Sequence, residues 1–77
     1  MPPDVGKIIV KMKKQPHGIQ FSEAERVLSA YGYAFERQKG SHRRYGNGKD
    51  HVTLPRQNPL KAAYVRAILD IIEEVEI

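Results

Sequence analysis

The last third of the chain carries the apolar pattern that most restricts its fold. Apolar side chains recur there at every third or fourth position: Leu60, Ala63, Tyr64, Ala67, Ile68, Ile71, Ile72 and Val75. This spacing predicts a helix with one apolar face. Asn58 can cap that helix, with Pro59 at its first position. Because an apolar helix face has to be covered, the rest of the chain must supply a second layer.

Two shorter helices are predicted upstream. Helical spacing of apolar residues predicts one helix over residues 5–14, which ends before Pro16-His17-Gly18; its apolar residues are Val5, Ile8, Ile9 and Met12. Ser22 and Glu25 fit a capping box at the start of a second helix over residues 23–31. That helix presents a face made of Ala24, Val27, Leu28 and Tyr31, and Gly32 follows where a C-terminal cap belongs.

Between the second and the last helix the pattern changes to the alternation of strands. Three short segments, residues 33–38, 41–45 and 51–54, are separated by turn-like sequences. The expected order is helix, helix, three strands, helix. This order predicts a two-layer α+β fold with a three-stranded antiparallel sheet packed on helices, and it is also the order in double-stranded RNA-binding domains.

Length and composition exclude several classes of protein. With 77 residues, the chain is expected to form a single domain over residues 1–77. The absence of cysteine excludes disulfides, thiolate zinc sites and cysteine nucleophiles. The three histidines lack the close spacing of metal ligands, and no glycine-rich phosphate loop is present, so neither a metal nor another cofactor is expected. No apolar run could span a membrane and the start does not resemble a signal peptide, so a cytoplasmic protein is expected.

Positive charge is concentrated in the middle of the chain. The formal net charge is +4. Between Arg37 and Arg66 there are eight basic residues and one acidic residue, Asp50. A polyanion such as nucleic acid is a natural partner for this segment, and a solvated basic surface without a partner is the alternative.

Alternation along the strands predicts which side chains face the helices. These are Tyr33, Phe35, Ser41, Arg43, Tyr45, Val52 and Leu54, although Arg43 fits this side poorly. The opposite, open face then gathers His42, Arg44, His51 and Thr53, framed by Gln38, Lys39 and Arg56. A histidine among cations on an uncovered sheet is suited to handling a phosphate. The four tyrosines have core spacing and are interpreted as packing residues first, and as platforms for bases only second.

The segment Lys39-Gly40-Ser41-His42 resembles the Gly-Ser-His signature of the HicA toxins, which are mRNA-cleaving members of bacterial type II toxin–antitoxin systems. The likeness runs from about Ser22 to Ile72. It includes further segments in the same order, namely Tyr31-Gly32-Tyr33, Arg37-Gln38-Lys39, Val52-Thr53-Leu54-Pro55-Arg56, Leu60-Lys61 and Tyr64-Val65-Arg66-Ala67-Ile68-Leu69. The resemblance therefore implies a core over residues 22–72 and an N-terminal extension with a short helix over residues 1–20.

The resemblance implies a fold like that of double-stranded RNA-binding domains and metal-independent cleavage of mRNA. It implies that His42 is the catalytic histidine, and that a HicB-type antitoxin covers it. The chemistry of RNA cleavage indicates a role for His42 as general base for the 2′-OH, since histidine ordinarily titrates with a pKa of about 6.5. The residues expected to bind RNA are Lys39, Gly40, Ser41, Arg43, Arg44, Lys49 and Arg56.

Two points stay open at this level. Many family members carry a second histidine just after the third-strand proline, where this chain reads Pro55-Arg56-Gln57. The general acid is not evident, with His51 or water as the candidates. A non-catalytic RNA-binding module of the same fold is the main alternative function, and a purely protein-binding partner of an acidic regulator is a third.

Overall fold

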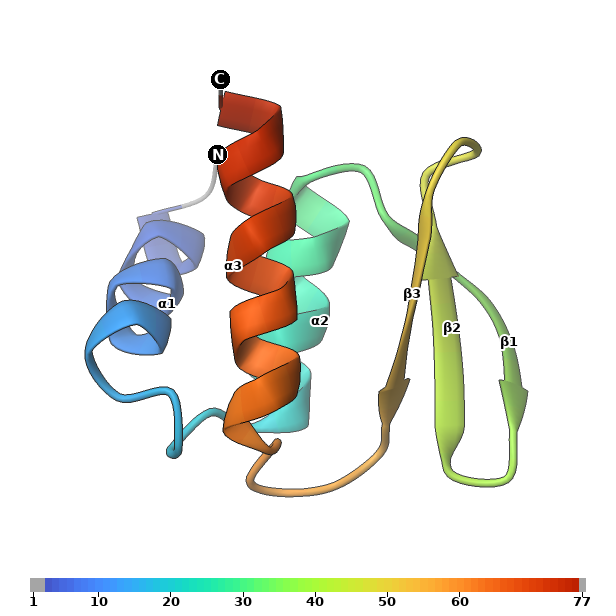
Figure 1. Cartoon of the computed structure of the whole chain (residues 1–77), viewed down its shortest axis with the longest axis horizontal. Coiled ribbons are helices and arrows are strands. Elements are labelled where there is room, and N and C mark those ends of the chain that lie inside the picture. Colours follow the sequence, from blue (N-terminus) through green and yellow to red (C-terminus); the bar gives the residue numbers. More distant parts are fainter. Residues whose placement is uncertain (1–2, 77) are drawn as a thin grey trace.

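The computed structural model describes residues 3–76, and the side chains of residues 4–74. Its elements are α1 (Pro3–Lys14), α2 (Phe21–Ala30), β1 (Ala34–Lys39), β2 (His42–Gly46), β3 (His51–Pro55) and α3 (Ala62–Glu76). The three helices gather on one side of the sheet (Figure 1). The predicted two-layer α+β architecture is therefore confirmed. Met1, Pro2 and Ile77 lie outside the described residues, as does the side chain of Val75, which was expected to extend the apolar helix face.

The first helix follows its apolar spacing. α1 begins two residues before the predicted start and ends at Lys14, as the Pro16-His17-Gly18 turn predicts. Its four apolar residues Val5, Ile8, Ile9 and Met12 are all buried. This helix is therefore committed to the core, against α2 and α3.

The predicted cap of the second helix is wrong. α2 begins at Phe21, and its capping box joins Gln20 to Glu23 rather than Ser22 to Glu25. The Gln20 amide donates to the Glu23 carboxylate at 2.9 Å, which leaves Glu25 free to face the sheet. The predicted C-terminal cap is confirmed: Gly32 has φ +85°, and the Tyr33 amide returns to the Leu28 carbonyl at 2.9 Å.

The start of the last helix is also displaced. α3 begins at Ala62, because the Asn58 side chain accepts a hydrogen bond from the Phe21 amide at 2.7 Å and is not available as its cap. Its buried face differs from the predicted stripe, since Val65 is buried and Ala63 is exposed. Leu60, Ile68 and Ile72 are buried as expected.

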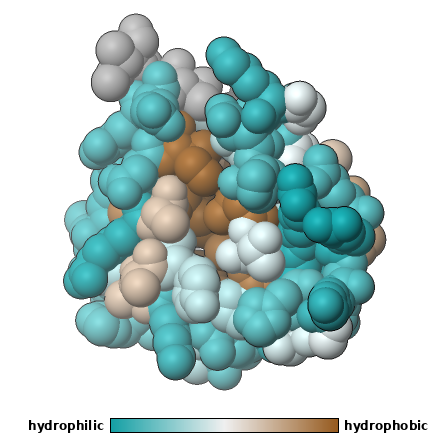
Figure 2. Space-filling view, turned by 45° about the vertical axis from the view of Figure 1, so that its right-hand side comes forward, coloured by the Kyte–Doolittle hydropathy of each residue, from teal (hydrophilic) through white to brown (hydrophobic). Residues whose placement is uncertain are grey.

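The sheet is antiparallel in the order β1-β2-β3. Its helix-facing side carries the buried Tyr45 and Leu54, and Figure 2 shows hydrophobic residues in a hollow on a largely hydrophilic surface. Phe35 is on the helix-facing side opposite Tyr45, yet it is 49% exposed because nothing in the helix layer covers it fully. The expectation that Phe35 joins the core is thus met only in part. No helix among residues 3–76 is both long and apolar enough to traverse a bilayer.

Candidate functional site

His42 stands at the first position of β2, directly after a tight turn. Gly40 and Ser41 form the two-residue connection, and Gly40 has φ +61°, a conformation that other residues resist. His42 pairs with Lys39 on one side and with Pro55 on the other. It is exposed, and strand alternation directs it to the face without helices. The predicted position of His42 on the open face is confirmed.

Three unpaired cations surround this end of the sheet. Lys39 faces His42 across the strands on the same side, and Arg37 is the next open-face residue of β1. Arg56 follows β3, and its amide donates to the Ser41 carbonyl at 2.6 Å, which ties it to the turn. Within the part of the chain that the structure describes, none of these three side chains takes part in an ion pair. The local potential at His42 is therefore positive.

Arg44 lies on the open face as predicted, but its charge is compensated. Its Nε contacts the Glu36 carboxylate at 3.0 Å. A bulge in β1 places Glu36 and Arg37 together opposite Arg44, and the Glu36 side chain covers Gly46 so closely that a Cβ there would collide with it. Glu36 was not among the residues predicted from the sequence, although it is the only acidic residue in β1 and could have been found on that ground.

Arg43 lies on the helix-facing side, away from His42. Its guanidinium donates to the Tyr45 hydroxyl from Nε at 3.0 Å and to Gln38 from Nη1 at 2.9 Å. It also lies 3.4 Å from the Glu25 carboxylate and 4.1 Å from the centre of the Phe35 ring. The structure thus gives Arg43 a role in joining the sheet to α2, on the opposite side of the sheet from His42.

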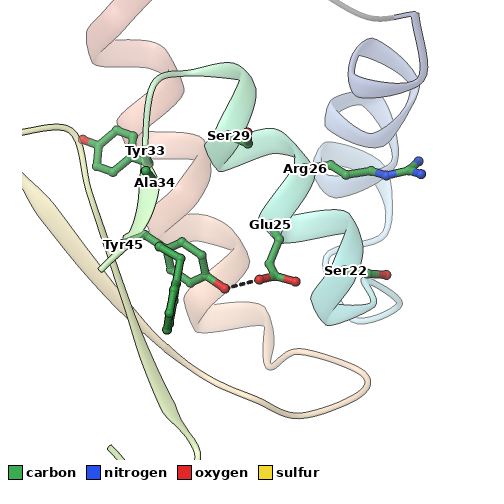
Figure 3. A pocket seen from close by; sticks show the side chains of 8 residues that line it. Ser22, Glu25, Arg26, Ser29, Tyr33, Ala34 and Tyr45 are labelled. Atoms are coloured by element: carbon green, nitrogen blue, oxygen red, sulfur yellow. Dashed lines mark hydrogen bonds between the residues drawn. The ribbon is translucent and has the colours of Figure 1, made fainter. Parts of the chain in front are cut away.

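Three side chains that contact Arg43 line a groove of about 540 Å³ between α2 and the sheet (Figure 3), namely Glu25, Phe35 and Tyr45. The Tyr45 hydroxyl donates to Glu25, which reaches across from α2. Burial and then the bond to Glu25 raise the pKa of Tyr45 to about 12. The bond to Tyr45 in turn raises the pKa of Arg43. This groove opens on the helix-facing side, so it is separate from His42.

His51 shares the open face with His42 but not its neighbourhood. It pairs with Gly46, four residues along β2 from His42, which corresponds to about 13 Å at the usual strand rise. The two imidazoles therefore cannot act on one phosphate. Lys49 lies in the loop at the His51 end of the sheet, where the Asn47 side chain accepts from the Lys49 and Asp50 amides. Gln38, expected to frame the open face, lies on the other side opposite Arg43.

The comparisons with known proteins identify the family. The chain matches the HicA toxins of bacterial toxin–antitoxin systems over residues 21–74. It belongs to this family. The comparisons with curated proteins and with solved structures gave no match. The resemblance seen in the sequence is thereby confirmed, and membership in the HicA family implies a cognate antitoxin as partner.

The match to the HicA family begins at the start of α2, so α1 lies outside the matched segment. Even so, α1 buries four apolar side chains in the same core. The Pro55-Arg56-Gln57 segment lies inside the match, and its Pro55 is the strand partner of His42. Gln57 is partly buried, and its side chain accepts from the Lys61 amide at 3.2 Å. The Gln57 side chain is therefore hydrogen-bonded to the residue that directly precedes α3. Among residues 4–74, no cluster of three or more histidine and acidic side chains is arranged to hold a metal.

Proposed function

We propose that this HicA-family chain is an endoribonuclease that cuts mRNA without a metal, with His42 as the general base. The observation that carries the proposal is the position of His42. It is exposed at the head of β2, next to Lys39 across the strands, on a face that the helices leave open. A base and a cation on one accessible surface are what cleavage by the RNA's own 2′-OH requires.

In the proposed reaction His42 accepts the proton of the 2′-OH, whose oxygen attacks the adjacent phosphorus. The bond from phosphorus to the 5′ oxygen breaks, and a water molecule protonates that oxygen. The products are a 2′,3′-cyclic phosphate and a 5′-hydroxyl end. Water is assigned as the acid because His51 lies about 13 Å away along the strand. Lys39 stabilises the negative charge that grows on the phosphate oxygens.

RNA is proposed to bind through its phosphates to the unpaired cations near His42. Lys39, Arg37 and Arg56 are the nearest, and Gly40 and Ser41 allow the backbone of the turn to approach. Arg44 contributes less because Glu36 compensates its charge. Lys49, at the far end of the sheet, contacts a different phosphate from the one that is cut. A HicB-type antitoxin is proposed to cover His42 and to neutralise the same cations.

The test incubates the wild-type protein and the His42→Ala variant with a long RNA in the presence of a chelator. The wild type is expected to cut and the variant to lose activity while it keeps the fold, since an exposed substitution costs no more than about 0.5 kcal/mol. His17→Ala serves as the matched control, because His17 is exposed in the turn after α1. Cleavage by His42→Ala at a rate close to wild type would refute the assignment.

A non-catalytic RNA-binding module is the second candidate. The observation in its favour is that His51, the other histidine of the open face, lies about 13 Å from His42 along the strand. This function predicts that the RNA stays intact with both wild type and His42→Ala. It also predicts that both proteins bind RNA alike, with an affinity that depends on salt.

A further inference from the structure

The peptide between Gly40 and Ser41 is held in one orientation by Gln38. The Gln38 side chain lies on the helix-facing side of the sheet, and its Nε2 donates to the Gly40 carbonyl at 2.8 Å. The only cis peptide within residues 3–76 is Asn58–Pro59, so the Gly40–Ser41 peptide is trans. In a planar trans peptide the N–H points opposite to the carbonyl. The Ser41 N–H is therefore directed to the side that carries His42 and Lys39.

The Ser41 N–H has no hydrogen-bond partner among the described residues. No hydrogen bond from it to any described residue exists, although the Ser41 carbonyl accepts from the Arg56 amide. An exposed turn amide ordinarily bonds to water, and it is also a ready donor to an anion. Its place between His42 and Lys39 in the sequence and in the hairpin puts it where a phosphate bound to both would lie.

Gln38 is itself fixed by a chain of contacts that reaches α2. Its Oε1 accepts from Arg43 Nη1 at 2.9 Å, so the two ends of its amide have different partners and the amide cannot rotate without losing both. Arg43 is held in turn by Tyr45 and Glu25. The orientation of the turn is therefore coupled to the packing of the sheet on the helix layer.

We propose that the Ser41 N–H donates to a phosphate oxygen at the cleavage site, and that Gln38 is the positioning residue that aims it. This inference rests on the proposed function and adds a donor to it. The N–H strengthens its bond as negative charge grows on the non-bridging oxygen during attack by the 2′-OH. It carries no proton away, so the balance of the reaction is unchanged. A donor that is already oriented needs no rearrangement during the reaction.

The first test compares the steady-state kinetics of wild type, Gln38→Met and Gln38→Glu. Methionine keeps the length of the side chain without its hydrogen bonds. Glutamate keeps the acceptor for Arg43 but has no N–H for the Gly40 carbonyl. Both variants are expected to lower kcat by about tenfold or more, which is less than the roughly 10²–10³-fold for complete loss of such a donor, because they misdirect the N–H without removing it. A Gln38 that acts only through Arg43 would leave kcat of Gln38→Glu at the wild-type level, which would overturn the proposal.

The matched control is Gln15→Met, since Gln15 is an exposed glutamine at the end of α1, outside the sheet. It is expected to keep wild-type kinetics. Circular dichroism at the assay temperature checks that every variant is folded, so that a change in kcat is not a loss of folded protein.

The second test does not depend on cleavage. Amide NMR spectra of the ¹⁵N-labelled full chain are recorded with an oligoribonucleotide whose 2′-hydroxyls are methylated, so that it binds without reacting. The Ser41 amide proton is expected to move downfield in the wild type and to lose most of that shift in Gln38→Met. A Ser41 amide that stays still while Lys39 and His42 respond would overturn the proposal. If wild-type protein cuts no RNA, the proposed function fails and this spectrum still decides whether the donor exists.

Discussion

Replacement of Tyr45 by phenylalanine tests the link between the sheet and α2. Tyr45 is 3% exposed, and its hydroxyl accepts from Arg43 at 3.0 Å and donates to Glu25. Hydrogen bonds to charged groups contribute about 1.5–3 kcal/mol each. Arg43 and Glu25 lie 3.4 Å apart and can partly replace the lost bonds with each other. We therefore expect Tyr45→Phe to lower the free energy of unfolding by about 2 kcal/mol.

Urea unfolding followed by circular dichroism measures this loss, and an unchanged m-value shows that the same transition is compared. Thermal unfolding should show a decrease in Tm of about 4–8 °C per kcal/mol for a domain of this size. Tyr64→Phe is the control, since Tyr64 is partly buried and its hydroxyl has no hydrogen bond to the described residues. A loss in Tyr45→Phe no larger than that in Tyr64→Phe would refute the argument.

Tyr45→Phe is also expected to change the dependence of stability on pH in alkaline solution. Burial and the bond to Glu25 raise the pKa of Tyr45 from 10.0 to about 12 in the folded protein. A raised pKa means that this group's stabilisation is fully present below pH 10 and is lost as the pH rises toward 12. The difference in stability between wild type and Tyr45→Phe should therefore narrow over that interval. A constant difference would show that the hydroxyl does not titrate as its environment predicts.

Three further predictions concern α1, the open face and α2. Met12→Ala should lower the free energy of unfolding by about 2–5 kcal/mol in urea titrations, because Met12 is fully buried; a smaller loss would mean that α1 is dispensable. Glu36→Gln should raise RNA affinity and steepen its salt dependence, since Arg44 loses its partner; unchanged binding would remove Arg44 from the RNA surface. Burial raises the pKa of Glu23, but the Gln20 amide and Lys11 outweigh it and lower the pKa below 4.5. The advantage of wild type over Glu23→Gln should therefore disappear as the pH falls below 4.5, and its persistence in acid would contradict this.

Local pattern was enough to predict the elements but not their exact ends. The spacing of Ile8, Met12, Ile68 and Ile72 reports burial directly, because a helix face repeats every three or four residues. The cap of α3 could not be predicted in this way. Asn58 has the chemistry of a cap for the helix that follows it, yet it satisfies the amide of Phe21, 37 residues earlier in the chain. A side chain with two possible partners is assigned only by the tertiary structure.

The arrangement of the candidate site could likewise be predicted only in part from the sequence. Alternation placed His42, Arg44 and His51 on one face correctly, since parity depends only on the strand itself. Register between strands does not follow from parity, so the distance between His42 and His51 required the structure. The misfit of Arg43 on the helix-facing side was visible in the sequence, but its explanation was not. Its partners Glu25 and Gln38 come from two other elements.

The distribution of acids decides which cations a partner can use. Glu25 and Glu36 compensate Arg43 and Arg44, whereas Lys39, Arg37 and Arg56 around His42 have no acidic partner in the described part of the chain. An antitoxin that covers His42 would remove these three charges from water, and a desolvated charge without a partner costs several kcal/mol. Such an antitoxin must therefore bring its own acids to them. RNA phosphates would bind to the same side chains. On the proposed function, the acids of the antitoxin and the phosphates of the RNA therefore compete for these three cations, whatever the shape of the antitoxin.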